Sequence, residues 1–90
     1  MHFALLYEYV PDVVERRKPF REAHLALLRR LHAEGRLLHA GAFQPVDGAL
    51  LVFRTDSAAD VEAFVKVDPY VQNGIVTRWR IREWNVVVGG

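Results

Sequence analysis

The stretch that decides the fold is Gln44-Pro45-Val46-Asp47-Gly48, a turn near the middle of the 90-residue chain. Asp-Gly between two apolar runs is a strong signal for a β-hairpin, because both residues accept the backbone conformations that a tight turn needs. The two flanking runs cover residues 37–43 and 49–54 and are rich in apolar side chains. The sequence therefore predicts two adjacent antiparallel strands joined at this turn.

Outside the hairpin, a helical segment lies on each side. Pro19 suits the first turn of a helix, and a helix is predicted from there to residues 33–34. After the hairpin, Asp56 or Ser57 is the candidate N-cap of a second helix. We expect that helix to end at Asp68, because a following proline disfavours the helical conformation.

Strands are predicted at both ends of the chain, over residues 3–10 and 75–88. The resulting order is βαββαβ, which is typical of the ferredoxin-like α+β sandwich, an antiparallel sheet with both helices on one face. Ninety residues suit a single domain, so we expect one domain over 1–90.

The predicted sheet is apolar on both faces. In the first strand only Glu8 interrupts the apolar set, and strands 37–43 and 49–53 are also apolar on both faces. A sheet with one face in water alternates apolar and polar residues. We therefore expect the second face to be covered by a second copy of the chain, as a homodimer packed sheet to sheet.

Composition excludes several classes. Twelve Lys and Arg against eleven Asp and Glu give a net charge of +1, whereas nucleic-acid binders usually show a strong basic excess. Nucleic-acid binding through the arginine stripe Arg78, Arg80 and Arg82 is therefore disfavoured. The chain has no cysteine and no apolar stretch of about 18 residues, so we expect a cytoplasmic protein that binds no membrane.

No feature of the sequence predicts a metal or a cofactor. His2, His32 and His39 lack the spacing of metal ligands, and no glycine-rich phosphate loop is present.

His24 is a polar residue on an apolar helix face. The buried stripe predicted for the first helix consists of Phe20, Ala23, Leu27, Leu28 and Leu31. His24 falls inside this stripe, where an imidazole needs a hydrogen-bond partner. One interpretation is a core histidine bonded to a backbone carbonyl, and the other is a catalytic acid or base.

Asp68 is also a polar residue at a position where the pattern predicts an apolar one. It continues the inward stripe of Val61, Phe64 and Val65, and it lies at a helix C-terminus, where the helix dipole disfavours a negative charge. It is either a turn residue that binds nearby amides or the partner of His24. Both helices pack on one sheet face, so the two side chains can meet, and a carboxylate would orient the imidazole as a general base. The pattern leaves both interpretations open.

The same residues make the chain resemble the YCII-related family of small bacterial proteins, over residues 3–88. The matching elements are Arg21 and His24 in Arg-x-x-His followed by Leu25, Gly41, Asp47-Gly48, Asp68-Pro69-Tyr70, Gly74-Ile75 and Trp84. Glu83 departs from the proline that the family often carries before the tryptophan.

The resemblance implies a dimeric α+β barrel of ferredoxin-like subunits, with His24 and Asp68 as the proposed active-site pair. Most family members have no assigned reaction, and a few act as dehydrochlorinase-type or isomerase-type enzymes on aromatic compounds.

Together, placement and resemblance predict a cofactor-independent enzyme in which His24 is the general acid/base and Asp68 orients it. The reaction would be isomerisation or elimination on a small anionic metabolite. Arg21 is the first candidate for binding the substrate's charge, and Tyr7, Phe43 and Tyr70 are candidates for the pocket wall. The alternative is a non-catalytic dimeric module that binds a small molecule or has an accessory role, in which His24 and Asp68 only fasten the two helices together.

Overall fold

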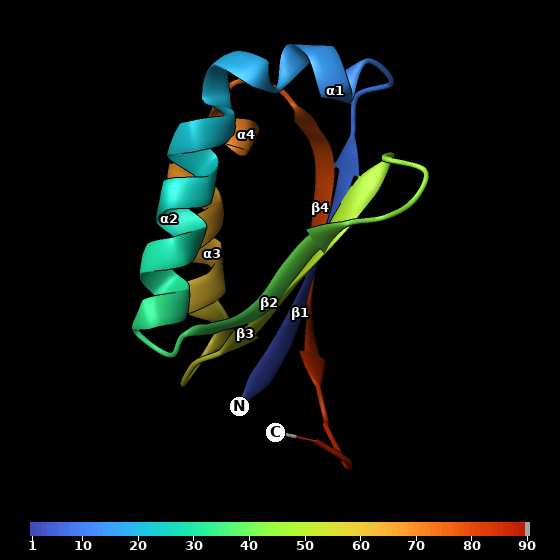
Figure 1. Cartoon of the computed structure of the whole chain (residues 1–90). Helices are drawn as coiled ribbons and strands as arrows, with labels where there is room; N and C mark the ends of the chain where they lie inside the picture. The colour runs from blue at the N-terminus through green and yellow to red at the C-terminus, as the bar shows by residue number, and fades with distance from the viewer. Residues whose placement is uncertain (90) are drawn as a thin grey trace.

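The hairpin predicted at Asp47-Gly48 is present and forms one edge of a four-stranded antiparallel sheet (Figure 1). The strands are β1 (His2–Tyr9), β2 (Leu37–Ala42), β3 (Gly48–Arg54) and β4 (Val76–Trp84). Their order across the sheet is β2-β3-β1-β4. The two terminal strands therefore lie side by side, and β1 occupies the centre. The computed structural model describes residues 1–89.

Two helices, α2 (Arg21–Ala33) and α3 (Ala58–Val67), cover the same face of the sheet (Figure 1). This arrangement is the ferredoxin-like α+β fold that the order of elements predicted. Three short segments were not predicted: α1 (Val13–Arg16), the 3-10 helix η1 (Lys18–Phe20) and α4 (Pro69–Gln72). The first helix thus begins at Arg21 rather than at Pro19, which lies in η1.

The hydrophobic core lies between the sheet and these helices. Alternate residues of the central strands point into it: Phe3, Leu5 and Tyr7 of β1, and Ala49, Leu51 and Phe53 of β3. Burying each large side chain contributes roughly 1.5–3 kcal/mol. The sheet therefore presents a continuous apolar floor on which both helices rest.

The buried stripe of α2 is narrower than predicted. Leu28 and Leu31 are buried, Phe20 and Leu27 are half-buried, and Ala23 is exposed. α2 lies over the edge strand β2, so the sheet covers only part of its circumference. His24 remains inside the buried part.

The last strand ends earlier than predicted, at Trp84 instead of residue 88. Trp84 pairs with His2, the first residue of β1. β1 and β4 both end at this pair, so β4 has no neighbouring strand beyond Trp84. Val87 and Val88 are consequently exposed.

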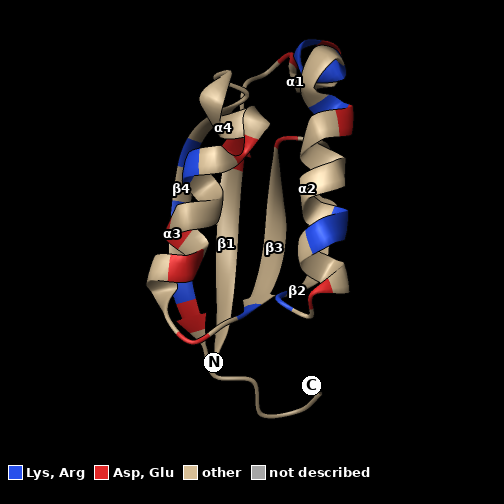
Figure 2. Ribbon diagram, turned by 90° about the vertical axis from the view of Figure 1, so that its left-hand side faces the viewer, with Lys and Arg blue, Asp and Glu red and all other residues tan. Residues whose placement is uncertain are grey.

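Among residues 1–89, no helix lies on the other side of the sheet, which we call the outer face (Figure 1). The register places Ala4, Leu6, Leu50 and Val52 on this face in the two central strands. Arg78, Arg80 and Arg82 share it along the edge strand β4, opposite Glu8, Leu6 and Ala4. The central strands carry little charge, whereas β4 is banded with basic residues (Figure 2).

None of the helices within residues 1–89 is long and apolar enough to cross a lipid bilayer.

Candidate active site

His24 is held on the first turn of α2, on the side that faces α4. Only 5% of the residue is exposed, which makes it one of two buried polar or charged residues among those described. The other is Asp68, which is 0% exposed. A buried imidazole and a buried carboxylate are each costly unless they are hydrogen-bonded.

Asp68 is placed by the proline that follows it. Pro69 excludes the helical conformation at residue 68, which has φ −68° and ψ 120°, so α3 ends there. The chain then starts α4, and the Asp68 carboxylate becomes its N-cap by accepting a hydrogen bond from the Tyr70 backbone N–H at 3.0 Å. The cap fixes the direction in which the carboxylate points.

The two side chains meet. His24 Nδ1 lies 2.7 Å from Asp68 Oδ1. Because a carboxylate only accepts hydrogen bonds, Nδ1 carries the proton, and in the neutral ring Nε2 then has a free lone pair. The structure thus supports the His–Asp interpretation over a histidine bonded to a backbone carbonyl.

Tyr7 completes the surroundings of the carboxylate. Its phenol O–H donates to Asp68 Oδ2 at 2.6 Å from the floor of the sheet. Burial, followed by the negative charge of Asp68, raises the pKa of the Tyr7 phenol well above its usual value, so it remains a donor. Three donors from β1, α2 and α4 therefore hold Asp68 in one orientation.

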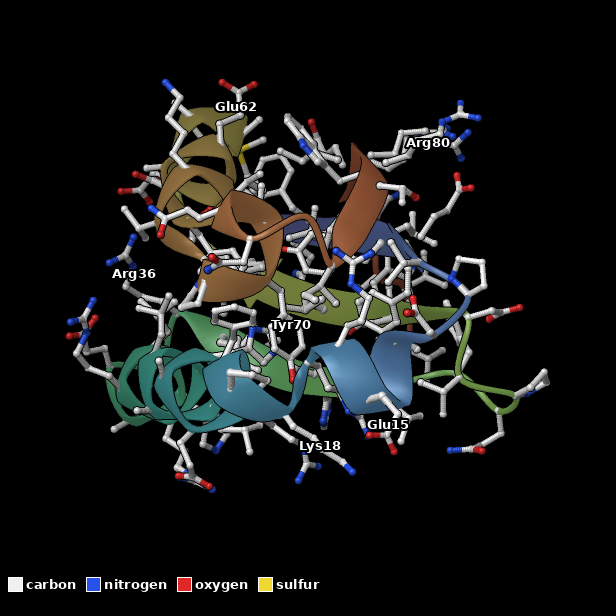
Figure 3. The ribbon with its side chains drawn as sticks, turned by 90° about the horizontal axis from the view of Figure 1, so that it is seen from above. Glu15, Lys18, Arg36, Glu62, Tyr70 and Arg80 are labelled. Carbon is white, nitrogen blue, oxygen red and sulfur yellow. The ribbon has the colours of Figure 1, made fainter. Side chains whose placement is uncertain are left out.

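Tyr70 fixes the plane of the imidazole. Its ring stacks on His24 with centroids 3.7 Å apart and planes 5° from parallel. The Tyr70 side chain extends from α4 toward α2 (Figure 3). Burial raises the pKa of the Tyr70 phenol, and the positive charges of Arg17 and Arg21 oppose that effect. Rotation of the His24 ring is therefore limited by the stacked phenol as well as by Asp68.

A cavity of about 210 Å³ opens beside His24, between α2 and strands β2 and β3. Its polar lining comes from Tyr9, Arg17, Arg21, His24 and Tyr70, and its apolar lining includes Leu25, Leu28 and Leu51. Within the described residues, the one side-chain nitrogen or oxygen that is buried without a partner belongs to His2. Nε2 of His24, which has no hydrogen bond there, is therefore reached from the cavity.

The cavity contains some of the predicted substrate-binding residues and not others. Arg21 and Tyr70 line it beside His24. Tyr7 lies behind the carboxylate, 2% exposed. Phe43 lines a second cavity, of about 500 Å³, and Tyr7 also contributes to the lining of that second cavity. Strand alternation places Tyr7 inside the core. The same alternation continues past β2 and places Phe43, which pairs with Gly48, on the sheet face that α2 does not cover.

Arg17 and Tyr9 also line the cavity, and the sequence reasoning did not single them out as site residues. Arg17 precedes Arg21 by four residues and His24 by seven, which is the spacing of one helix face. That signal was available. Tyr9 follows a register shift between β1 and β4 at Glu8 and Tyr9, and such irregularities re-aim a side chain. Burial raises the pKa of the Tyr9 phenol to about 12.

Residues 1–89 hold no group of three or more His, Asp or Glu side chains placed to bind a metal ion.

These elements define a ferredoxin-like α+β domain with a buried His–Asp pair at a small cavity. Residues 1–85 match the model of the YCII-related domain, and the chain belongs to this family. The chain is 34% identical over 86 residues to Protein YciI of Escherichia coli O6:H1, a match that covers 84% of this chain and 88% of that protein. It is 29% identical over 85 residues to an uncharacterized protein of Haemophilus influenzae, covering 83% and 87%.

Among solved structures, the chain is similar to the 5-chloro-2-hydroxyhydroquinone dehydrochlorinase of Burkholderia phenoliruptrix, in complex with 2,5-dihydroxybenzoquinone. The TM-score is 0.82 at 23% identity, and the match covers 94% of both chains. This likeness supports the ferredoxin-like fold.

Proposed function

We propose that the chain is a cofactor-independent enzyme in which His24 moves a proton on a small metabolite bound in the 210 Å³ cavity. The observation that carries the proposal is the geometry of His24: Nδ1 is bound to Asp68 at 2.7 Å, and Nε2 is reached from the cavity. A histidine used only to fasten two helices has no need of an accessible nitrogen.

The chemistry follows from the lone pair on Nε2. It takes a proton from a carbon next to a carbonyl group, and the C–H electron pair becomes an enolate. Asp68 stabilises the imidazolium that forms. In an isomerisation, Nε2 returns the proton to another carbon. In an elimination, the electron pair expels a leaving group such as chloride, and the imidazolium later releases its proton to water.

The family and the fold give additional support for small-molecule chemistry. The structurally similar dehydrochlorinase acts on a chlorinated ring compound, as its name states. Elimination of chloride is one of the two reactions for which the dyad is suited.

The proposal is tested by following proton abstraction directly. We suggest incubating the protein with 4-oxocyclohexanecarboxylate in D2O and measuring exchange of the protons next to the ketone by NMR. Chloride release from 5-chloro-2-hydroxyhydroquinone serves as the second assay. The wild type should accelerate at least one reaction, and His24→Gln should reduce the acceleration by about 10²- to 10⁴-fold. Asp68→Asn should reduce it as well, because the imidazole then loses its orientation and its counter-charge.

Two results would contradict the proposed acid/base function. If His24→Gln matches the wild type in both assays, or if neither substrate reacts faster than in buffer while both bind in the cavity, the acid/base function is wrong. The second interpretation, a small-molecule-binding module, then describes the protein.

A further inference from the structure

The cavity beside His24 is graded in polarity along α2. Arg17, Arg21, His24 and Leu28 follow one another at helical spacing and all line the cavity. Two cationic side chains therefore lie at the end near η1, the imidazole lies next, and leucine side chains lie at the far end. A ligand in this cavity meets positive charge at one end and apolar surface at the other.

Among the described residues, the two arginines have no counterion. Among residues 1–89, neither Arg17 nor Arg21 has a carboxylate oxygen within 4.0 Å. Their neighbours differ: Arg16 lies 4.0 Å from Asp12, and Lys18 lies 3.0 Å from Glu15. Glu15 and Lys18 point away from the body of the protein (Figure 3).

In the part of the chain that the structure describes, no acidic residue lines the cavity, and Asp68 is fully buried behind His24. Arg17 is also partly buried, unlike Arg16 and Lys18. Two guanidinium groups that face a cavity without a carboxylate suit an anionic ligand, because their planar donors match the geometry of a carboxylate.

The volume limits the rest of the ligand. An apolar cavity of about 150 Å³ holds one benzene ring. The 210 Å³ found here matches one six-membered ring with a small substituent better than two fused rings with a substituent. Leu25, Leu28 and Leu51 supply the apolar walls for such a ring.

Resting on the proposed function, we infer that Arg17 and Arg21 together bind the carboxylate of a substrate with a single ring, and that the ring lies against the leucines with His24 beside it. Arg17 is in this view a specificity-determining residue alongside Arg21. The substrate class is the ring monocarboxylates.

Binding can be measured apart from catalysis with four probes: benzoate, benzamide, acetate and 2-naphthoate. We expect NMR titration of the amide and arginine side-chain signals to give the tightest binding for benzoate. Benzamide, which lacks the charge, acetate, which lacks the ring, and 2-naphthoate, which has two rings, should each bind at least about tenfold more weakly, a difference of about 1.4 kcal/mol.

Three substitutions locate the effect. Arg17→Gln and Arg21→Gln should each weaken benzoate binding by about tenfold while leaving benzamide binding unchanged. Arg16→Gln is the matched control, since its side chain is exposed and paired with Asp12, and it should bind benzoate like the wild type. If benzamide binds as tightly as benzoate, if benzoate does not bind, or if Arg17→Gln behaves like Arg16→Gln, the inference is wrong.

The experiments distinguish failure of the catalytic proposal from failure of the substrate-class inference. Should benzoate binding depend on both arginines while His24→Gln leaves proton exchange unaltered, the substrate-class inference stands and the catalytic proposal falls. Should exchange depend on His24 while the arginine variants bind benzoate normally, the catalytic proposal stands and the substrate class is wrong.

Discussion

At the scale of single residues, Asp68 is the centre of the site. Its two oxygens receive hydrogen bonds from Tyr7, His24 and the Tyr70 backbone, which belong to three different elements. The carboxylate therefore has little freedom to turn, and it transmits that restraint to the imidazole. The same bonds that stabilise the fold also fix the tautomer of His24.

The hydrogen bond from the Tyr7 hydroxyl to Asp68 can be tested by measuring the free energy of unfolding. Tyr7→Phe removes the donor to Asp68 Oδ2 and leaves a buried acceptor unpaired, so we expect a loss of roughly 1–3 kcal/mol at pH 7. The variant should keep the fold, because the phenyl ring fills the same volume. Urea unfolding at pH 7 measures the loss.

The stability of the wild type and that of Tyr7→Phe should depend differently on pH. The pKa of Tyr7 is raised in the folded protein, so its stabilising contribution is fully present below pH 10 and is lost as the pH rises further. Each pH unit above about 10 should cost the wild type roughly 1.4 kcal/mol through this residue. Phenylalanine does not ionise, so the stability difference between the two proteins should shrink from pH 10 to 11. Parallel curves would contradict the assignment.

Sequence reasoning located His24 and Asp68 because each interrupts an apolar stripe. It could not assign Tyr7 to the carboxylate, since a tyrosine on an inward strand position looks like any core aromatic. The contact depends on the distance between the sheet and the start of α4. The tertiary structure sets this distance, so the local sequence does not reveal it. Arg17 carried a local signal, since it precedes Arg21 by four residues and His24 by seven.

At the scale of elements, the break between α3 and α4 builds the site. Without Pro69, residue 68 is free to continue the helix, and its side chain would then leave the position from which it caps α4 and binds His24. Short helices such as α1 and α4 have little stability of their own, which is why sequence patterns did not indicate them. Tertiary contacts keep them in place.

Pro69→Ala tests the role of this break. We expect the hydrogen-bonded Nδ1–H signal of His24 to weaken or broaden in NMR spectra, because Asp68 samples helical conformations. Stability should fall by roughly 0.4–1 kcal/mol through the greater entropy of the unfolded chain.

Pro19→Ala is the matched control for that entropy term, since Pro19 also lies in the first turn of a short helix and does not line the cavity. Its His24 signal should equal that of the wild type. If Pro69→Ala also leaves the signal intact, the hydrogen bonds alone hold Asp68, and the proline is dispensable for the site.

At the scale of the whole molecule, the alternation of apolar segments and turns was sufficient to predict the sheet, its two helices and their common face. The end of the last strand was not predictable from composition. It depends on where the neighbouring strand β1 begins, because His2 lies opposite Trp84. The outer face of the sheet combines apolar and basic residues. Its central strands present Leu6 and Leu50, whereas its arginines lie on the edge strand β4.

We propose that a second copy covers this face, with the sheets packed together. Arg80 points outward from the sheet, on the side away from the helices (Figure 3). Because Arg78, Arg80 and Arg82 all belong to an edge strand, a contact centred on β1 and β3 leaves them at the rim, where charged groups of interfaces usually remain hydrated. The apolar residues of the two central strands then form the centre of the contact.

Sedimentation equilibrium tests this arrangement. The wild type should have about twice the 10.3 kDa mass of one chain. Leu50→Glu places a charge at the centre of the proposed contact and should give folded monomers, because position 50 is half-exposed in a single chain. Val67→Glu, at an exposed apolar residue on α3, is the control and should stay dimeric. A monomeric wild type, or a Leu50→Glu variant that remains dimeric, would show that the outer face is not the contact, and circular dichroism of both variants establishes that neither has unfolded.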